Sequence, residues 1–149
     1  HLGIEKSKIK ENIDGFGVLT KIKDNQSFLG ILFNSRIFPH VAPQGNDLLT
    51  VIIGGARQPQ LIDQDVNKLK KTIINEIRKI ISYDGKIIME NNFLWKNGIP
   101  QYDLDHDVLI ENISDFHKKN KNFYILGNYI KGISVSDCIQ NAFELSKKL

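Results

Sequence analysis

The sequence predicts an α+β fold in which a mixed or antiparallel sheet with flanking helices is followed by a short strand, a glycine-bearing turn and a capped helix. Three observations lead to this fold class. Short apolar segments separated by turn residues are typical of strands, and they occupy the first third of the chain. The segment from Asp63 to Ser82 carries apolar residues at three- and four-residue steps, which is the period of a helix. The stretch GNYIKGISVSDCI at 127–139 then ends an apolar segment and begins another helical pattern.

Three strands are expected early in the chain, after an opening at 1–4 that already lies in a strand or its approach. These strands are Val18–Ile22, Phe28–Phe33 and Leu48–Ile53. The turn-rich segment KDNQS separates the first two, and a pair of glycines closes the third. The segment FPHVAPQG at 38–45 contains two prolines and a glycine, so we expect a loop there.

The helices follow in chain order. The helix at Asp63–Ser82 has an apolar stripe, and its basic residues fall mainly on the other side, as they do on a solvated face. The elements expected after it are an extended segment at Lys86–Trp95, a helix at Asp107–Lys119, a short strand at Phe123–Leu126 and a last helix at Asp137–Lys148. Ser134 and Asp137 have the spacing of a capping box, which places a hydroxyl and a carboxylate at the start of that helix.

Composition narrows the class of protein. The chain has 149 residues, a net charge of +3 and 25% charged residues, as in one globular domain. Its basic residues form no stripe with interleaved aromatics, so no nucleic-acid partner is expected. A lone cysteine, Cys138, allows no internal disulfide and indicates a reducing compartment, which we take to be the cytoplasm. No apolar run has membrane-spanning length, and peripheral contact with the inner face of the plasma membrane stays open.

No pattern in the chain supplies a complete catalytic site. There is no Gly-x-Ser-x-Gly motif, and Cys138 is expected to be a small core residue rather than a nucleophile. The four histidines lack the spacing of metal ligands, and the acidic cluster of Asp103, Asp105 and Asp107 fits the entry of a helix. We therefore predict neither a catalytic side chain nor a metal site.

The stretch at 127–139 can hold an anion or another electron-rich group. A helix that begins after a glycine turn presents unpaired N–H groups and the positive end of its dipole. The alternative is a well-capped helix start that holds no ligand.

Six motifs occur in an order and spacing that resemble the C-terminal part of the protoporphyrinogen oxidases, the FAD enzymes near the end of haem biosynthesis. The motifs are GFGVL at 15–19, LGILF at 29–33, FP at 38–39 with AP at 42–43, LLT at 48–50 with GGAR at 54–57, Trp95 with IPQY at 99–102, and GNYIKGISVSDCI at 127–139. The resemblance covers almost the whole chain. The wider flavin amine-oxidase superfamily shares only the closing strand–glycine–helix piece, usually with Gly-Glu where this chain has Gly127 and Asn128.

The resemblance implies a fold in two parts. In the family, a Gly-x-Gly-x-x-Gly unit near the N-terminus begins the FAD domain, and a C-terminal strand and helix complete its Rossmann-like fold. Residues 1–98 are then the latter part of a substrate-binding domain, and residues 99–149 are the C-terminal segment of the FAD domain. Because this sequence lacks the glycine motif, we expect a piece of a longer protein. By itself it would neither hold FAD tightly nor oxidise a substrate, and its missing N-terminal part would be its partner.

The resemblance also implies the residues of two sites. The backbone of Ile133, Ser134 and Val135 would touch the flavin, with Gly132 permitting a close approach. Trp95 matches a tryptophan that contacts FAD in some bacterial members. The residues that match the apolar substrate pocket are Phe16, Leu19, Leu32, Ile52 and Ile99, and each of them also fits a plain core position. The implied reaction is the six-electron oxidation of a porphyrinogen to a porphyrin, with FAD taking the hydride equivalents and oxygen as the acceptor.

Several alternatives stay open. Coproporphyrinogen is the substrate of related bacterial enzymes, and the sequence does not distinguish it from protoporphyrinogen. Another flavin amine oxidoreductase, such as an amine oxidase or a carotenoid desaturase, is disfavoured by the pairing of IPQY with GISVSDCI. A non-enzymatic α+β binding module would expose no large apolar surface. A piece of an oxidase would expose sheet and FAD-domain surfaces, with a tendency to form homo-oligomers.

Overall fold

The computed structural model describes residues 1–147 and 149, and its contacts divide the chain into two compact units. Unit 1 is His1–Phe93 and unit 2 is Leu94–Leu149. The division falls between residues 93 and 94, whereas the sequence predicts a boundary between 98 and 99, so Trp95 belongs to unit 2. That the units correspond to a substrate-binding domain and an FAD domain stays a prediction.

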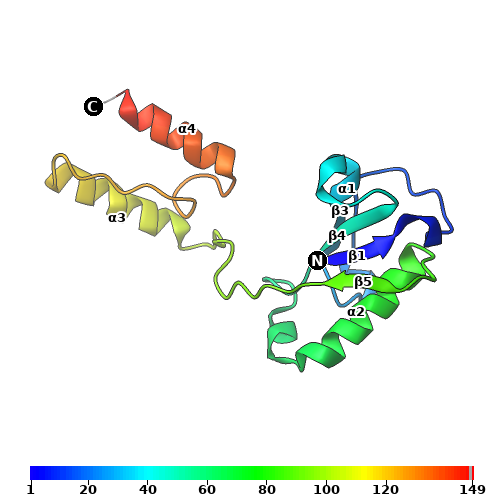
Figure 1. Ribbon diagram of the computed structural model, residues 1–149. Helices are drawn as coiled ribbons and strands as arrows, with labels where there is room; N and C mark the ends of the chain where they lie inside the picture. The colour runs from blue at the N-terminus through cyan, green and yellow to red at the C-terminus, as the bar shows by residue number, and fades with distance from the viewer. Residues whose placement is uncertain (148) are drawn as a thin grey trace. The chain divides into compact units, whose positions relative to one another are not determined.

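Unit 1 is built on a five-stranded sheet (Figure 1). Its strands are β1 (Leu2–Glu5), β2 (Gly17–Leu19), β3 (Gly30–Phe33), β4 (Asn46–Ile52) and β5 (Ile87–Glu90). They lie in the order β2-β3-β4-β1-β5, and all the paired neighbours are antiparallel. The predicted α+β class with an antiparallel sheet is therefore confirmed.

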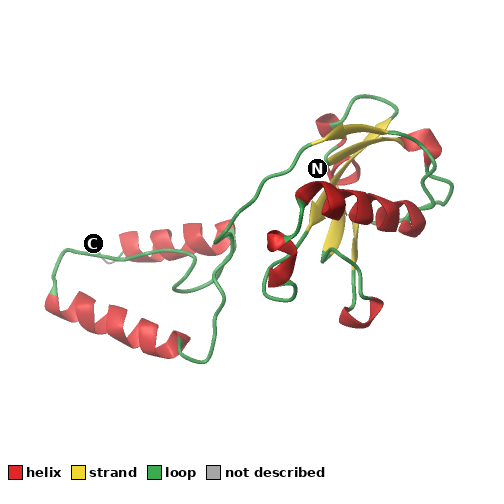
Figure 2. Ribbon diagram, turned by 90° about the horizontal axis from the view of Figure 1, so that it is seen from below, coloured by secondary structure: helices red, strands yellow, loops and turns green. Residues whose placement is uncertain are grey.

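One face of this sheet is covered by α2 (Val66–Ile80), which lies across the strands (Figure 2). The apolar stripe of α2 supplies Ile73 and Ile77 to a buried cluster that also contains Phe33 of β3. Asp65 caps the helix, since its carboxylate accepts a hydrogen bond from the Lys68 N–H at 2.8 Å. The helix that the amphipathic pattern predicts thus packs its apolar stripe against the sheet.

The ends of some elements differ from the predicted ones because local hydrogen bonds form 3₁₀ helices there. Ile22 continues an apolar pattern, but it begins a 3₁₀ helix at Ile22–Asp24, in which the Asp24 carboxylate accepts a hydrogen bond from the Lys21 N–H at 3.0 Å. Helix α2 starts at Val66 rather than Asp63 because Pro59–Asp63 forms a 3₁₀ helix of its own. The remaining short elements are the 3₁₀ helices Lys6–Lys8 and Pro39–Val41 and the single helical turn α1 (Asn34–Ile37).

Unit 2 contains the helices α3 (His106–Lys119) and α4 (Val135–Ser146), joined by a long connection (Figure 1). The connecting residues 120–134 run back along α3. His117 Nε2 accepts a hydrogen bond from the Ile125 N–H at 2.9 Å, and His106 Nε2 lies 3.2 Å from the Ile130 carbonyl oxygen. A cavity of about 290 Å³ is lined by residues of both helices and of this connection.

The strand predicted at Phe123–Leu126 is absent from the structure of the described residues. A strand requires hydrogen bonds to a neighbouring strand, and the described part of unit 2 contains none that could pair with it. The Rossmann-like return implied by the resemblance is therefore not confirmed. The last helix ends at Ser146, and its predicted end at Lys148 lies outside the described residues.

Candidate functional site

Three of the predicted substrate residues share the sheet face that α2 leaves open. The register pairs Leu19 with Gly30 and Gly30 with Ile52, so these residues form one row across β2, β3 and β4. Leu32 lies two residues from Gly30 on the same strand and therefore on the same face. Leu19 is 86% exposed, Ile52 is also exposed and Leu32 is half-buried. None of the three side chains is buried, so they do not occupy the plain core positions that the sequence also allowed.

Two positions of β2 and β3 on this open face are occupied by glycine. A Cβ on Gly30 would stand 2.8 Å from the Val18 carbonyl oxygen, and a Cβ on Gly17 would stand 2.5 Å from the Ile31 carbonyl oxygen. Side chains do not tolerate such distances, so the close pairing of β2 with β3 requires glycine at both positions. The result is a largely apolar sheet face on which two positions carry no side chain.

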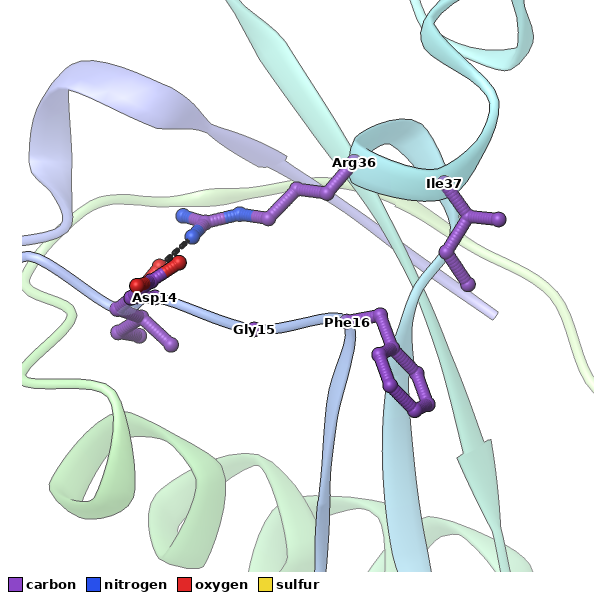
Figure 3. A pocket seen from close by; sticks show the side chains of 6 residues that line it. Asp14, Gly15, Phe16, Arg36 and Ile37 are labelled. Carbon is purple, nitrogen blue, oxygen red and sulfur yellow. Dashed lines mark hydrogen bonds between the residues drawn. The ribbon is translucent and has the colours of Figure 1, made fainter.

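Phe16 lies one residue before β2 and lines a separate hollow (Figure 3). Its carbonyl accepts a hydrogen bond from the Phe33 N–H at 2.8 Å, and its side chain is 68% exposed. The hollow has a volume of about 640 Å³ and is lined by Ile13, Asp14, Gly15, Phe16, Arg36 and Ile37. The fifth predicted substrate residue, Ile99, is exposed in unit 2. The structure therefore brings Leu19, Leu32 and Ile52 together on one surface, and the other two lie outside it.

Arg36, which lines the hollow, belongs to a buried network that sequence reasoning missed. Its Nη2 lies 3.6 Å from Asp47 Oδ2, and its Nη1 donates a hydrogen bond to the Ile13 carbonyl (Figure 3). Asp47 is buried and accepts a hydrogen bond from Ser35 Oγ at 2.8 Å. Because the Asp47 carboxylate balances the guanidinium, Arg36 is a structural cation rather than a free anion-binding group. The one signal in the sequence is an aspartate at the start of an otherwise apolar strand.

The turn before α4 is organised by a capping box. Ser134 Oγ accepts a hydrogen bond from the Asp137 N–H at 3.0 Å. The Asp137 carboxylate in turn accepts hydrogen bonds from the Ser134 hydroxyl at 2.6 Å and from the Ser134 N–H at 3.1 Å. These two bonds hold the pKa of the Asp137 carboxyl below its ordinary value, and the bond from the Ser134 hydroxyl contributes more than the bond from the N–H. The predicted capping box is confirmed.

Gly132 has a structural role in this turn. Its φ is +76°, and a Cβ at this position would stand 2.4 Å from the Asp137 side chain. The capping turn itself therefore requires glycine here, independently of any ligand. Its role in the close approach of a flavin stays a prediction.

Two backbone donors of the turn are available to a ligand. Within the described part of the chain, the N–H groups of Ile133 and Val135 have no hydrogen-bond partner. They lie at the positive end of the dipole of α4, which is 12 residues long. Such donors suit an electron-rich ring edge or a phosphate, so the residues present fit one part of a flavin.

Trp95 is the remaining predicted cofactor residue. It lies between β5 and α3, in a segment without regular secondary structure, and its side chain is 78% exposed. None of the ring contacts found among the described residues ties its indole to the turn before α4. Contact of Trp95 with FAD therefore stays a prediction.

The acidic cluster at 103–107 forms the entry of α3. Asp103 accepts a hydrogen bond from the Asp105 N–H through its carboxylate and one from the His106 N–H through its carbonyl, each at 3.2 Å. In the part of the chain that the structure describes, no three His, Cys, Asp or Glu side chains gather as metal ligands. No helix in that part has both the length and the apolar character needed to cross a membrane.

The chain is similar in sequence to enzymes that oxidise porphyrinogens, although no family model matches it. It is 31% identical over 137 residues to protoporphyrinogen oxidase 2 of chloroplasts and mitochondria from Arabidopsis thaliana, with 90% of this chain and 27% of that protein covered. It is 22% identical over 139 residues to coproporphyrinogen III oxidase from Bacillus subtilis, with 93% of this chain and 30% of that protein covered.

A solved structure shares the fold. It is that of a protein described as a protoporphyrinogen oxidase from Exiguobacterium sp. 255-15, with a TM-score of 0.77 at 16% identity over 99% of this chain and 33% of that one. At this identity the likeness concerns the fold alone. The chain thus spans 27% to 33% of the length of the proteins named here. The resemblance to part of a protoporphyrinogen oxidase that the sequence predicts is confirmed over 90% of this chain.

Proposed function

We propose that this chain is the C-terminal portion of an FAD-dependent porphyrinogen oxidase of haem biosynthesis. The observation that carries the proposal is its sequence similarity to protoporphyrinogen and coproporphyrinogen oxidases. The complete enzyme catalyses the six-electron oxidation of protoporphyrinogen, or of coproporphyrinogen, to the porphyrin with oxygen as the acceptor. The chemistry that FAD supplies when bound is the removal of hydride equivalents from the porphyrinogen.

The open face of the sheet is the substrate surface in this proposal. Leu19, Leu32 and Ile52 present aliphatic side chains on this face, and a flat tetrapyrrole removes apolar area from water when it lies on them. No ionisable side chain belongs to these rows, so the surface orients the substrate and excludes water rather than transferring protons. Phe16 and Ile99 lie outside this surface, and their contact with the substrate stays a prediction.

The turn before α4 supplies part of the flavin site. The N–H groups of Ile133 and Val135 donate hydrogen bonds to the flavin, Gly132 and Ser134 shape the turn, and Trp95 contacts the cofactor. The sequence contains no Gly-x-Gly-x-x-Gly motif to hold the pyrophosphate, so this chain carries half of the site. We expect the isolated chain to bind FAD weakly and to show no oxidase turnover, and we expect the N-terminal part of the enzyme to complete it.

Two further properties belong to the proposal. The free Cys138 favours a reducing compartment, and we place the enzyme in the cytoplasm, with at most peripheral contact with the inner face of the plasma membrane. Unit 2 exposes apolar side chains such as Val108, Ile139 and Phe143. Exposed apolar side chains of this size support a surface that the rest of the enzyme, or a second copy of it, covers.

Binding of the stable product protoporphyrin IX tests the substrate surface. The 149-residue chain is titrated with the porphyrin, and the Soret absorbance is followed. Leu19→Asp places a charge in the apolar row and is expected to weaken binding at least about tenfold, because a carboxylate is costly to bury.

Ile22→Asp is the matched control, since Ile22 is 84% exposed but lies in a 3₁₀ helix outside the sheet. An equal loss of binding in both variants would contradict the assignment of the surface. The same titration with coproporphyrin III shows which of the two macrocycles the surface prefers.

The flavin turn is tested by an NMR titration of the chain with millimolar FAD, riboflavin or ATP. The amide signals of Ile133 and Val135 are expected to shift with FAD and with riboflavin, because both molecules contain the isoalloxazine ring. Shifts with ATP alone would assign the turn to a phosphate instead. Stoichiometric flavin with oxidase turnover in the isolated chain would overturn the claim that it carries half of the site.

A further inference from the structure

Two stacked aromatic rings hold the segment that leads into the turn before α4. The rings of Tyr102 and His106 lie 4.0 Å apart, centroid to centroid, and are nearly parallel at 8°. Tyr102 Oη donates a hydrogen bond to the Asn128 carbonyl at 2.6 Å, and His106 Nε2 lies 3.2 Å from the Ile130 carbonyl oxygen. Because a carbonyl oxygen only accepts, Nε2 carries the proton of that hydrogen bond.

The same segment is also held from α4. Asn141 Nδ2 donates a hydrogen bond to the Lys131 carbonyl at 2.6 Å, and the Gly127 carbonyl accepts one from the Ile130 N–H at 3.1 Å. The carbonyl groups of residues 127, 128, 130 and 131 are therefore engaged within unit 2. The N–H groups that follow, at residues 133 and 135, are left for a ligand.

We propose that Tyr102 and His106 are positioning residues for the flavin, and this inference rests on the proposed contact of the flavin with the turn. The connection at 120–134 has no regular secondary structure and no buried side chain, so side-chain hydrogen bonds contribute to holding it in place. A turn that is already ordered does not lose conformational entropy when it binds a ligand. The stacked pair thus acts through the backbone, by its hydrogen bonds to the carbonyl groups of Asn128 and Ile130.

Tyr102→Phe isolates the hydroxyl, because it keeps the stacked ring and removes only the donor to the Asn128 carbonyl. Tyr124→Phe is the matched control: Tyr124 lies in the same unit at similar exposure, and its hydroxyl has no partner among the described residues. We expect Tyr102→Phe to speed hydrogen exchange of the Ile130 amide about fivefold and to raise the apparent Kd for FAD about fivefold. Tyr124→Phe is expected to change neither.

Variants at His106 separate the stack from the hydrogen bond. His106→Phe keeps an aromatic ring without a donor, and we expect it to behave as Tyr102→Phe does. His106→Gln keeps an N–H donor without the ring. We expect its Ile130 amide to exchange more slowly than that of His106→Phe and at a rate closer to that of the unmodified chain.

The two measurements distinguish failure of this inference from failure of the proposed function. If the unmodified chain shifts its Ile133 and Val135 amides with FAD but Tyr102→Phe changes the Kd no more than Tyr124→Phe, the positioning role is wrong and the flavin contact stands. Faster exchange at Ile130 with an unchanged Kd overturns the positioning role in the same way. If the unmodified chain shows no shift with FAD, the flavin contact and the inference that rests on it both fall.

Discussion

The two units of this chain are stabilised by different means. Unit 1 contains all the buried apolar side chains of the described residues, and Phe28, Phe33 and Leu49 are fully covered. Across the described residues of unit 2 no side chain is buried, and the connection between its helices is held by hydrogen bonds to side chains such as His117 and Asn141. Two helices without a further layer cannot cover their own apolar faces. Unit 1 therefore has a core of its own, whereas the helices of unit 2 leave apolar side chains such as Ile139 and Phe143 exposed.

The largest expected effect is the loss of a core side chain from unit 1. Phe33→Ala removes a fully buried ring and is expected to lower the free energy of unfolding of unit 1 by about 3–5 kcal/mol. The matched change in unit 2 is Ile113→Ala in α3, whose side chain is half-buried, with an expected loss of about 1 kcal/mol. Urea unfolding followed by NMR signals of each unit measures both.

Phe33→Leu serves as the control for that comparison, because it keeps most of the buried volume and should cost less than Phe33→Ala. If Ile113→Ala proved as destabilising as Phe33→Ala, unit 2 would possess a core of its own and the contrast between the units would fail.

A smaller effect is expected at the capping box of unit 2. Ser134→Ala removes the acceptor of the Asp137 N–H and should destabilise α4 by about 1 kcal/mol. Hydrogen exchange of the Asp137 amide measures it. Ser136→Ala is the control, since the Ser136 hydroxyl has no partner in the described part of the chain. Equal exchange in the two variants would mean that the cap contributes nothing to unit 2.

The smallest effect is the response of the same cap to acid. The pKa of Asp137 in the folded chain is lowered by the hydrogen bonds from Ser134. A carboxyl whose folded pKa is lowered stabilises the fold above its unfolded pKa, and that contribution is lost as the pH falls through the folded value. We therefore expect the first turn of α4 to loosen below about pH 4.

NMR signals of residues 134–137, recorded across the acid range, measure this loosening. Asp137→Asn keeps an acceptor of similar shape but does not titrate, so its signals should lose that pH dependence. An unchanged acid response in Asp137→Asn would assign the titration to another group.

Much of the local structure could be predicted because its signals lie within a few residues. The Ser134-to-Asp137 spacing predicted the capping box, and the apolar stripe predicted the helix that packs the sheet. Element ends were less accurate, since the 3₁₀ helix Ile22–Asp24 is stabilised by a hydrogen bond from the Lys21 N–H to the Asp24 carboxylate, which the apolar pattern does not reveal. The strand at Phe123–Leu126 was wrong for a related reason: a strand depends on a neighbour, which no local pattern supplies.

The sequence by itself determined the sheet of unit 1, the amphipathic helix that packs on it, the capped turn before α4 and the resemblance to protoporphyrinogen oxidases. Only the tertiary structure decided that Leu19, Leu32 and Ile52 share an open face, because that face follows from the register of β2, β3 and β4. It also decided the ion pair of Arg36 with Asp47 and the hydrogen bond from the Tyr102 hydroxyl to the Asn128 carbonyl. The partners in these contacts are far apart along the chain, and only folding brings their atoms within hydrogen-bonding or ion-pairing distance.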